Sequence, residues 1–165
     1  MERNRVVLLI GGNEGDRLSL LAEARSRIGK RIGDLVGVSE VYETEPWGFD
    51  AEQNFLNQGL LVETALGAME VLEEALAIEA ELGRVRHGKG YASRPMDIDL
   101  IFYNNEVTDG PRLTLPHPRM HLRRFVLQPL SDIIPDYIHP LFHKSVKELL
   151  DECEDEAKTI TMTLR

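Results

Sequence analysis

Two aspartates with one residue between them, Asp97 and Asp99, are the first candidates for chemistry. In a strand, residues i and i+2 point to the same face, about 6.6 Å apart along the chain. Ile98, Leu100 and Phe102 would then face the core. Adjacent carboxylates repel each other unless a cation lies between them, and Mg²⁺ takes oxygen ligands, waters and phosphates. The pair therefore indicates a metal site, with an ordinary exposed pair of strand carboxylates as the alternative.

Basic residues flank this pair on both sides, namely Arg84, Arg86, Lys89 and Arg94 before it, and Arg112, His117, Arg119, Arg123 and Arg124 after it. Cations around two carboxylates are typical of phosphoryl transfer, where positioning and charge neutralisation carry most of the catalysis. The chain has no G-x-x-x-x-G-K-[ST] motif, which excludes a P-loop enzyme. The glycines at 11, 12 and 15 are more simply interpreted as a strand-to-helix turn.

Other catalytic chemistries find little support in the sequence. The single cysteine, Cys153, lies in an acidic segment over 151–156 that would raise a thiol pKa. No G-x-S-x-G motif is present. His117 and His121 have i,i+4 spacing, but Pro118 lies between them and no H-E-x-x-H motif exists. A nucleophilic cysteine or serine and a histidine zinc site are therefore not expected.

The overall composition is that of a globular protein, with 42% hydrophobic and 28% charged residues among 165. A net charge of −9 argues against a nucleic-acid binder. No segment approaches the roughly 20 apolar residues of a membrane helix, and one cysteine suits a reducing cytoplasm. Residues 84–124 carry 8 basic and 4 acidic residues, whereas 34–83 carry 12 acidic and none basic. This block indicates a local anion site, unless the charges cluster by chance.

The hydrophobic pattern predicts strands over 5–10, 35–44, 54–63 and 96–103, and helices over 16–28 and 69–82. Asp16 is expected to cap the first helix, Gly29 and Gly33 to end it, and Gly83 to close the second. This β-α-β-β-α-β order is that of an α+β, ferredoxin-like sandwich. Additional C-terminal elements are expected: strands over 113–116 and 159–164, and helices over 125–133 and 146–151.

Seven short motifs follow one another along nearly the whole chain. They are Gly11-Gly12-Asn13, Tyr42-Glu43-Thr44-Glu45-Pro46-Trp47-Gly48, Phe55-Leu56-Asn57, Glu79 with Gly83-Arg84-Val85-Arg86, Arg94-Pro95-Met96-Asp97-Ile98-Asp99-Leu100, Leu115-Pro116-His117-Pro118-Arg119-Met120 and Arg123-Arg124-Phe125. Each is weak alone. The ordered set resembles the 6-hydroxymethyl-7,8-dihydropterin pyrophosphokinases of folate biosynthesis.

The resemblance implies Mg²⁺-dependent transfer of pyrophosphate from ATP to the pterin hydroxymethyl group, with release of AMP. It implies that Asp97 and Asp99 bind two Mg²⁺ ions together with ATP, and that Arg84 and Arg94 act on the triphosphate. Further ATP contacts are implied at Glu79, Arg86, Tyr91, Ile98, Arg112, Thr114, His117 and Arg123. The implied pterin pocket comprises Thr44, Trp47, Phe55, Asn57 and Phe125, whose aromatic faces and amide suit a flat polar heterocycle.

The sequence departs from the usual family pattern at four places: Gly12 replaces a serine, Glu45 a proline, Ala92-Ser93 a Gly-Pro pair, and Pro118 an aromatic residue. None of them touches the two aspartates. Nucleotidyltransferases also pair a glycine-rich turn with two carboxylates, but close in sequence, whereas Gly12 and Asp97 are 97 − 12 = 85 residues apart. A non-catalytic ferredoxin-like module is a third possibility, although it has no need of carboxylates ringed by arginines.

The organisation of the chain is expected to be simple. No linker or repeat interrupts it, which predicts a single catalytic domain over 1–165. No long exposed apolar helix demands a partner, so a monomer is expected. The loop over 84–95, with Gly88, Gly90 and several cations, is predicted to close over ATP.

Overall fold

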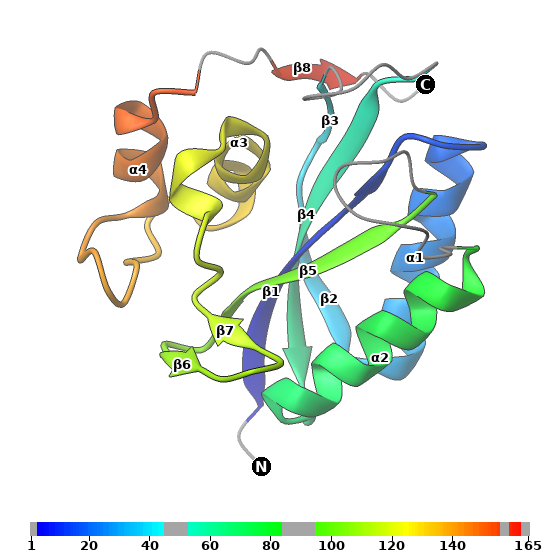
Figure 1. The fold of residues 1–165 in the computed structure, drawn as a ribbon, viewed down its shortest axis with the longest axis horizontal. Coiled ribbons are helices and arrows are strands. Elements are labelled where there is room, and N and C mark those ends of the chain that lie inside the picture. Colours follow the sequence, from blue (N-terminus) through cyan, green and yellow to red (C-terminus); the bar gives the residue numbers. More distant parts are fainter. Residues whose placement is uncertain (1–2, 45–52, 84–94, 156–158, 163–165) are drawn as a thin grey trace.

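The computed structural model describes residues 3–44, 53–83, 95–155 and 159–162. Its elements are β1 (Asn4–Gly12), α1 (Arg17–Arg31), β2 (Asp34–Val38), β3 (Val41–Thr44), β4 (Phe55–Thr64), α2 (Ala68–Glu81), β5 (Asp97–Tyr103), β6 (Thr108–Asp109), β7 (Thr114–Leu115), a 3-10 helix (Met120–Leu122), α3 (Arg124–Ile133), α4 (Val146–Glu152) and β8 (Thr159–Met162), as drawn in Figure 1. In this part of the chain, no helix has the length and apolar content to cross a membrane.

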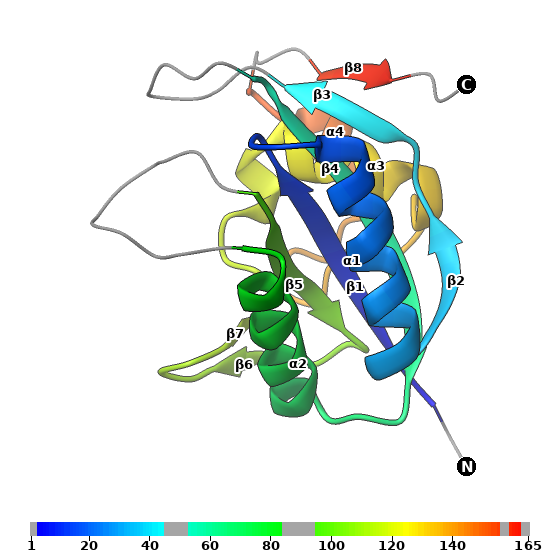
Figure 2. The same cartoon turned by 90° about the vertical axis from the view of Figure 1, so that its right-hand side faces the viewer.

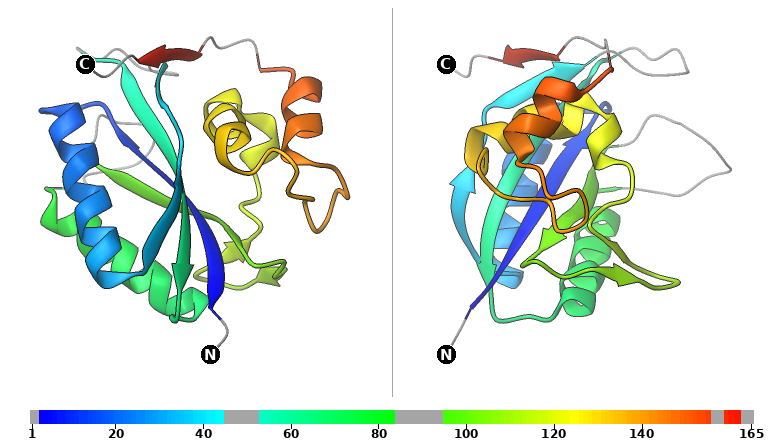
Figure 3. Two further views of the ribbon diagram at one scale, coloured as in Figure 1. Left: turned by 180° about the vertical axis from the view of Figure 1, so that it is seen from behind. Right: turned by 90° about the vertical axis from the view of Figure 1, so that its left-hand side faces the viewer.

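An antiparallel sheet forms the centre of the fold, with strands in the order β5-β1-β4-β3-β8 and with β2 also paired to β4. Helices α1 and α2 cover one face of this sheet, and α3 and α4 lie on the other (Figures 1 and 3). The predicted β-α-β-β-α-β arrangement and its ferredoxin-like fold are confirmed, as is the presence of additional C-terminal elements.

The first helix begins where the sequence predicts and ends later. The Asp16 side chain caps it by accepting a hydrogen bond from the Ser19 N–H at 3.3 Å. The helix then continues through Gly29 to Arg31, so the prediction that Gly29 ends it is wrong. Ile28 and Ile32 are buried on either side of Gly29. Packing of this apolar stripe outweighs the cost of about 1 kcal/mol for a helical glycine.

Two further predictions about strands need correction. The strand expected over 35–44 is two strands, because Ser39 interrupts it: its N–H donates to the Gly59 carbonyl and its hydroxyl accepts the Gly59 N–H, at 2.9 and 2.8 Å. The short strand predicted over 113–116 exists as β7, but it pairs with β6, which the sequence pattern did not indicate. A two-residue strand is too short to show a period of two.

Both faces of the sheet are buried, by two separate apolar clusters. Val6, Leu8 and Ile10 of β1 point to the α1 and α2 side, whereas Val7 and Leu9 point to the α3 side. Figure 2 looks onto the face of the sheet that α1 and α2 cover, with α3 and α4 behind it. Side chains along β1 point alternately to the two faces of the sheet. All of them from Val6 to Ile10 are apolar, because helices cover both faces.

A β-bulge in β5 corrects the expectation that Ile98, Leu100 and Phe102 share one face. Val7 pairs with Phe102 and Leu8 with Leu100, so Ile101 is the extra residue. Ile98 and Leu100 pack on the α1 and α2 side, while Phe102 packs on the α3 side. A bulge shifts the alternation by one residue, and the sequence period alone gives no sign of it.

Helix α3 lies close to the sheet because two glycines face it. A Cβ on Gly59 would lie 3.4 Å from side-chain atoms of Leu130 and Ile133, and one on Gly37 would lie 3.6 Å from Ile133. The C-terminal part of α3 is also tied to β3, because the Tyr42 hydroxyl donates to both Asp132 carboxylate oxygens at 3.0 and 2.9 Å. These contacts fix the orientation of the helix whose first turn carries Phe125.

The buried ring of His139 is expected to make the fold sensitive to acid. Its Nδ1 accepts the N–H groups of Leu141 and Phe142 at 3.1 and 3.2 Å, and its ring stacks on Phe142. Burial first, and then the charges of His121 and His143, lower the pKa of His139 from 6.5 to about 4. Between these values the unfolded chain binds more protons, so we expect the free energy of unfolding to fall as pH drops from 6.5 towards 4.

Urea unfolding across this pH window measures the effect. His139→Asn is the matched variant, because an amide oxygen can accept the same N–H bonds without titrating. Its unfolding free energy is expected to vary less with pH than that of the native protein. Equal slopes for the two proteins would contradict the assignment of this acid sensitivity to His139.

Candidate active site

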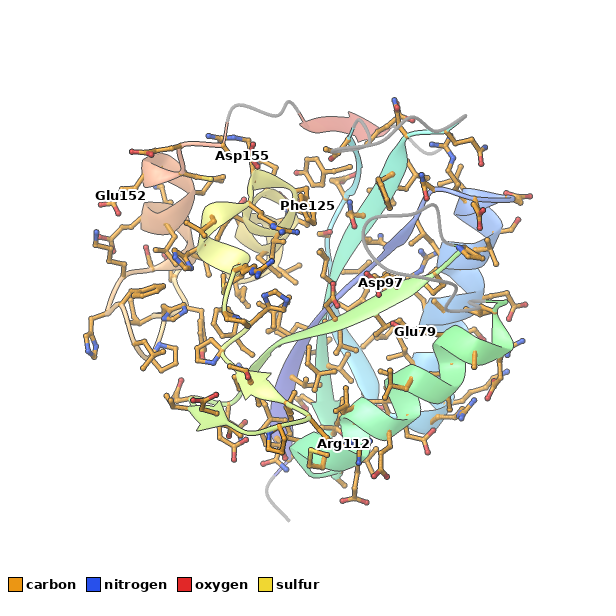
Figure 4. All side chains as sticks on the ribbon, viewed as in Figure 1. Glu79, Asp97, Arg112, Phe125, Glu152 and Asp155 are labelled. Carbon is orange, nitrogen blue, oxygen red and sulfur yellow. The ribbon has the colours of Figure 1, made fainter. Side chains whose placement is uncertain are left out.

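The two aspartates lie at the start of β5, on the α3 side of the sheet. Ile98 between them is buried on the opposite side, so Asp97 and Asp99 share one face and both are partly exposed, as the sequence predicts. The Glu79 side chain is buried behind them and its Oε2 accepts the Ile98 N–H at 2.6 Å. Figure 4 shows Glu79 between α2 and β5. This bond fixes the strand segment that carries both carboxylates.

A row of four residues crosses the sheet from the first carboxylate. Asp97 pairs with Gly11, Gly11 with Asn57, and Asn57 with Tyr42, which places these residues on one face of β5, β1, β4 and β3. A Cβ on Gly11 would approach the Asn57 Oδ1 atom more closely than atoms allow, so the amide of Asn57 lies directly over the glycine. Neighbouring strands are about 4.8 Å apart, so the backbones at Asp97 and Asn57, two strands apart, are separated by about 10 Å.

Three of the predicted pterin residues lie together beside this row. Thr44 pairs with Phe55 across β3 and β4, and Asn57 follows Phe55 on the same face. Asn57 and Thr44 are each 7% exposed, and the Thr44 hydroxyl has no hydrogen-bond partner within the described structure. A buried polar atom without a partner is costly. The Thr44 hydroxyl is therefore placed to bind a polar ligand.

Phe125 approaches this area from α3. Figure 4 shows its side chain on the flank of α3 that faces the sheet, with Asp97 on the other side of the intervening space. The Arg123 guanidinium lies over the Phe125 ring, 5.7 Å from its centre. Arg124 anchors the helix start by donating from Nε to the Asp155 carbonyl and from Nη2 to the Cys153 carbonyl, at 3.0 and 3.1 Å. The Phe125 ring and the Arg123 cation are thus held together at the first turn of α3.

His117 adds a hydrogen-bond donor near the carboxylates. Burial lowers its pKa, the charges of Arg123 and Arg119 lower it further, and Asp97 partly opposes them. The ring is therefore neutral at pH 7. Its Nδ1 accepts the Arg119 N–H at 3.2 Å, which assigns the proton to Nε2. The Nε2–H group can donate to an oxygen ligand, but the neutral ring cannot act as a cation.

Comparison with known proteins gives this arrangement a family. The family model for 7,8-dihydro-6-hydroxymethylpterin-pyrophosphokinase (HPPK) matches residues 7–135. The chain belongs to the HPPK family. It is 43% identical over 138 residues to a 2-amino-4-hydroxy-6-hydroxymethyldihydropteridine pyrophosphokinase of Porphyromonas gingivalis, covering 82% of this chain and 93% of the relative. An Aquifex aeolicus protein of the same name is 37% identical over 147 residues, covering 89% and 91%.

Solved structures support the fold of this HPPK family member. A Plasmodium falciparum HPPK-DHPS crystal structure with pteroate matches 92% of this chain with a TM-score of 0.73 and 16% sequence identity. The chain spans 42% of the length of that protein. The match establishes the ferredoxin-like fold, while the curated relatives establish the enzyme class. The chain is a pyrophosphokinase, a transferase.

The remaining predicted HPPK site residues differ in how they lie relative to Asp97, and several of them are outside the described part of the chain. Thr114 lies in β7, directly before the segment that carries His117. Arg112 lies by the first turns of α2, away from Asp97, and its Nη1 is 3.7 Å from a carboxylate oxygen of Glu73 (Figure 4). Arg112 and Thr114 stay predictions as ATP contacts. The described residues do not include Trp47, Arg84, Arg86, Tyr91 and Arg94, nor the loop predicted to close over ATP.

Two polar residues near the HPPK site were not predicted. Arg17, the first residue of α1, bonds to β3 and to the residue before β4, and Asn13 bonds to the Gln53 carbonyl at 3.4 Å. Arg17 had a signal in the sequence. A cation in the first turn of a helix is unfavourable towards the helix dipole, so an arginine directly after a capping aspartate indicates a specific partner elsewhere. Asn13 stands in the Gly11-Gly12-Asn13 motif, but that motif did not indicate its bond to the Gln53 carbonyl.

Proposed function

We propose that the chain transfers the pyrophosphoryl group of ATP to the hydroxymethyl group of 6-hydroxymethyl-7,8-dihydropterin in folate biosynthesis. The hydroxyl oxygen bonds to the β-phosphorus, the bond from that phosphorus to the α-phosphate oxygen breaks, AMP leaves, and the hydroxyl proton is released. The row from Asp97 through Gly11 to Asn57 carries this proposal, because it sets a phosphate-binding end next to a heterocycle-binding end. The names of the family and of the curated relatives agree with it.

The residues at the phosphate end fit a divalent cation. Asp97 and Asp99 offer only oxygen atoms as metal ligands. Among the described residues, no three or more histidine, cysteine, aspartate or glutamate side chains come together as a complete metal site, so a metal here needs further ligands from the substrate. Mg²⁺ is usually bound by one or two carboxylates together with substrate phosphates. We therefore assign Asp97 and Asp99 to two Mg²⁺ ions that arrive with ATP. When bound, these ions neutralise the phosphate charge and polarise the transferred group.

The side chains around the carboxylates suit the triphosphate. Neutral His117 donates from Nε2, and Arg123 supplies positive charge from the start of α3. Arg84 and Arg94 are assigned to the transferred group, where a cation is most effective as charge builds up. Arg86, Tyr91, Glu79, Ile98, Arg112 and Thr114 are assigned to the rest of the nucleotide.

The heterocycle end offers faces and edges for the pterin. Phe55 and Phe125 supply aromatic faces, and Trp47 is assigned to the same pocket. The Asn57 amide both donates and accepts, and the buried Thr44 hydroxyl gains a partner when the pterin binds. These groups hold the hydroxymethyl group towards Asp97. Substrate and nucleotide then react within one domain, and the protein is proposed to act as a monomer.

Product analysis tests the proposed function. ATP is incubated with Mg²⁺ with and without the pterin, and the nucleotide products are separated. We expect AMP and the pterin diphosphate only when all three components are present. Release of free pyrophosphate with a nucleotidylated product would indicate a nucleotidyltransferase, and unchanged ATP would indicate a binding module.

Phe125→Ala is expected to weaken pterin binding by about 1 kcal/mol or more, because one aromatic face is lost. ATP binding is expected to change little, since Arg123 and the carboxylates remain. Calorimetric titration with each ligand measures the two affinities. Phe142→Ala is a suitable control, because this phenylalanine packs against His121 and His139. Unaltered pterin affinity in Phe125→Ala would show that this ring does not stack on the pterin.

A further inference from the structure

Arg17 connects two strand ends that are separate in the sequence. Its Nη1 donates to the Glu43 Oε2 atom at 3.1 Å and to the Asn54 carbonyl oxygen at 2.9 Å. The side chain is 21% exposed and that of Glu43 is 28% exposed, so solvent screens this ion pair only in part. One guanidinium therefore links the end of β3 to the residue that precedes β4.

Both partners of Arg17 are direct neighbours of the heterocycle pocket. Glu43 precedes Thr44, and Asn54 precedes Phe55, while Thr44 and Phe55 pair with each other across the two strands. Asn13 adds a bond from its Nδ2 to the Gln53 carbonyl at 3.4 Å. Asn13, in the turn after β1, and Arg17, at the start of α1, thus bind the two successive carbonyl groups that precede β4.

The other arginine contacts of α1 have a different character. Arg27 and Arg31 pair with glutamates on the exposed side, including Glu81 of α2, and Arg25 donates to the Gln58 side chain at 2.7 Å. These bonds attach the helix to its neighbours within the body of the fold. Arg17 alone among these four arginines binds where β3 ends and β4 begins, at the edge that carries the pocket.

We propose that Arg17 is a positioning residue for the pterin: by tying Glu43 to the Asn54 carbonyl, it holds Thr44 and Phe55 in the geometry that binds the heterocycle. This inference rests on the proposed function, because it takes the pocket from it. Without Arg17 the two strand ends separate more easily, Phe55 and the Thr44 hydroxyl lose their alignment, and the nucleotide end is unaffected.

Arg17→Met tests the inference, since methionine keeps much of the side-chain length and removes every donor. We expect the pterin KM to rise roughly tenfold, which corresponds to about 1.4 kcal/mol, with kcat and the ATP KM nearly unchanged. Amide hydrogen exchange at residues 43–44 and 54–57 of the free protein is expected to accelerate. Arg25→Met is the matched control, with the same change in the same helix. It is expected to leave the pterin KM and these amides unchanged.

The outcomes separate this inference from the proposed function. A native pterin KM and native exchange in Arg17→Met, while the native enzyme turns the pterin over, would overturn the role of Arg17 alone. An equal rise of the pterin KM in Arg25→Met would also overturn it, because the effect would then be general destabilisation. Absence of pterin turnover by the native protein would overturn the proposed function itself. If Arg17→Met does not fold, Arg17→Lys decides: a smaller rise in pterin KM supports the inference, and a native value contradicts it.

Discussion

Asp97→Asn and Asp99→Asn are each expected to remove nearly all pyrophosphoryl transfer while the protein stays folded. Each change removes one negative charge from a proposed metal site and preserves the size of the side chain. Changes to groups that merely support a metal ligand cost about 10- to 100-fold, so the loss of a ligand itself is expected to exceed 100-fold in kcat. Both side chains are only partly buried, which favours folding of the variants.

Turnover at saturating Mg²⁺ and circular dichroism measure the two halves of this expectation. Asp109→Asn serves as the control, because Asp109 is an exposed carboxylate on strand β6 and has no proposed role in the reaction. It is expected to react at the native rate. Turnover near the native value in either Asp97→Asn or Asp99→Asn would rule out the two-metal assignment.

Gly11→Ala is expected to damage both the fold and the pterin pocket. The new Cβ would lie closer than 3.0 Å to the Leu56 carbonyl oxygen and to the Asn57 Oδ1 atom, and the backbone oxygen cannot rotate away. Overpacking of this kind costs about 1–3 kcal/mol in unfolding free energy. Displacement of the Asn57 amide is expected to weaken pterin binding at least tenfold, or about 1.4 kcal/mol.

Gly29→Ala provides a matched control with the opposite expected sign. Nothing lies within 4 Å of a Cβ added at Gly29, which sits inside α1. Alanine there is expected to raise the unfolding free energy by about 0.5–1 kcal/mol. Urea unfolding and calorimetric pterin titration compare the two variants. A Gly11→Ala protein with native stability and native pterin affinity would contradict the close packing of Asn57 over Gly11.

The features that the sequence predicted are those that depend on hydrophobic periodicity and on the order of motifs along the chain. The alternation in β5 placed Asp97 and Asp99 on one face, and the β-α-β-β-α-β order predicted the sheet that aligns them with Asn57. It did not predict the break at Ser39 or the bulge at Ile101, because both depend on hydrogen bonds to strands distant in the chain. It also did not predict that α3 lies against Gly37 and Gly59, which is a matter of tertiary packing.

The bulge at Ile101 makes β5 more tolerant of substitution than of deletion. Asp97 and Phe102 differ in parity, yet both lie on the α3 side, because the extra residue shifts the alternation between them. Removing that residue would reverse the faces to which the side chains on one side of the deletion point, relative to those on the other side. Either Phe102 would turn towards α1 and α2, or the two carboxylates would turn into the aliphatic cluster around Ile98 and Leu100. We therefore expect β5 to accept substitutions of single side chains but to lose its fold or its site when a residue is inserted or deleted.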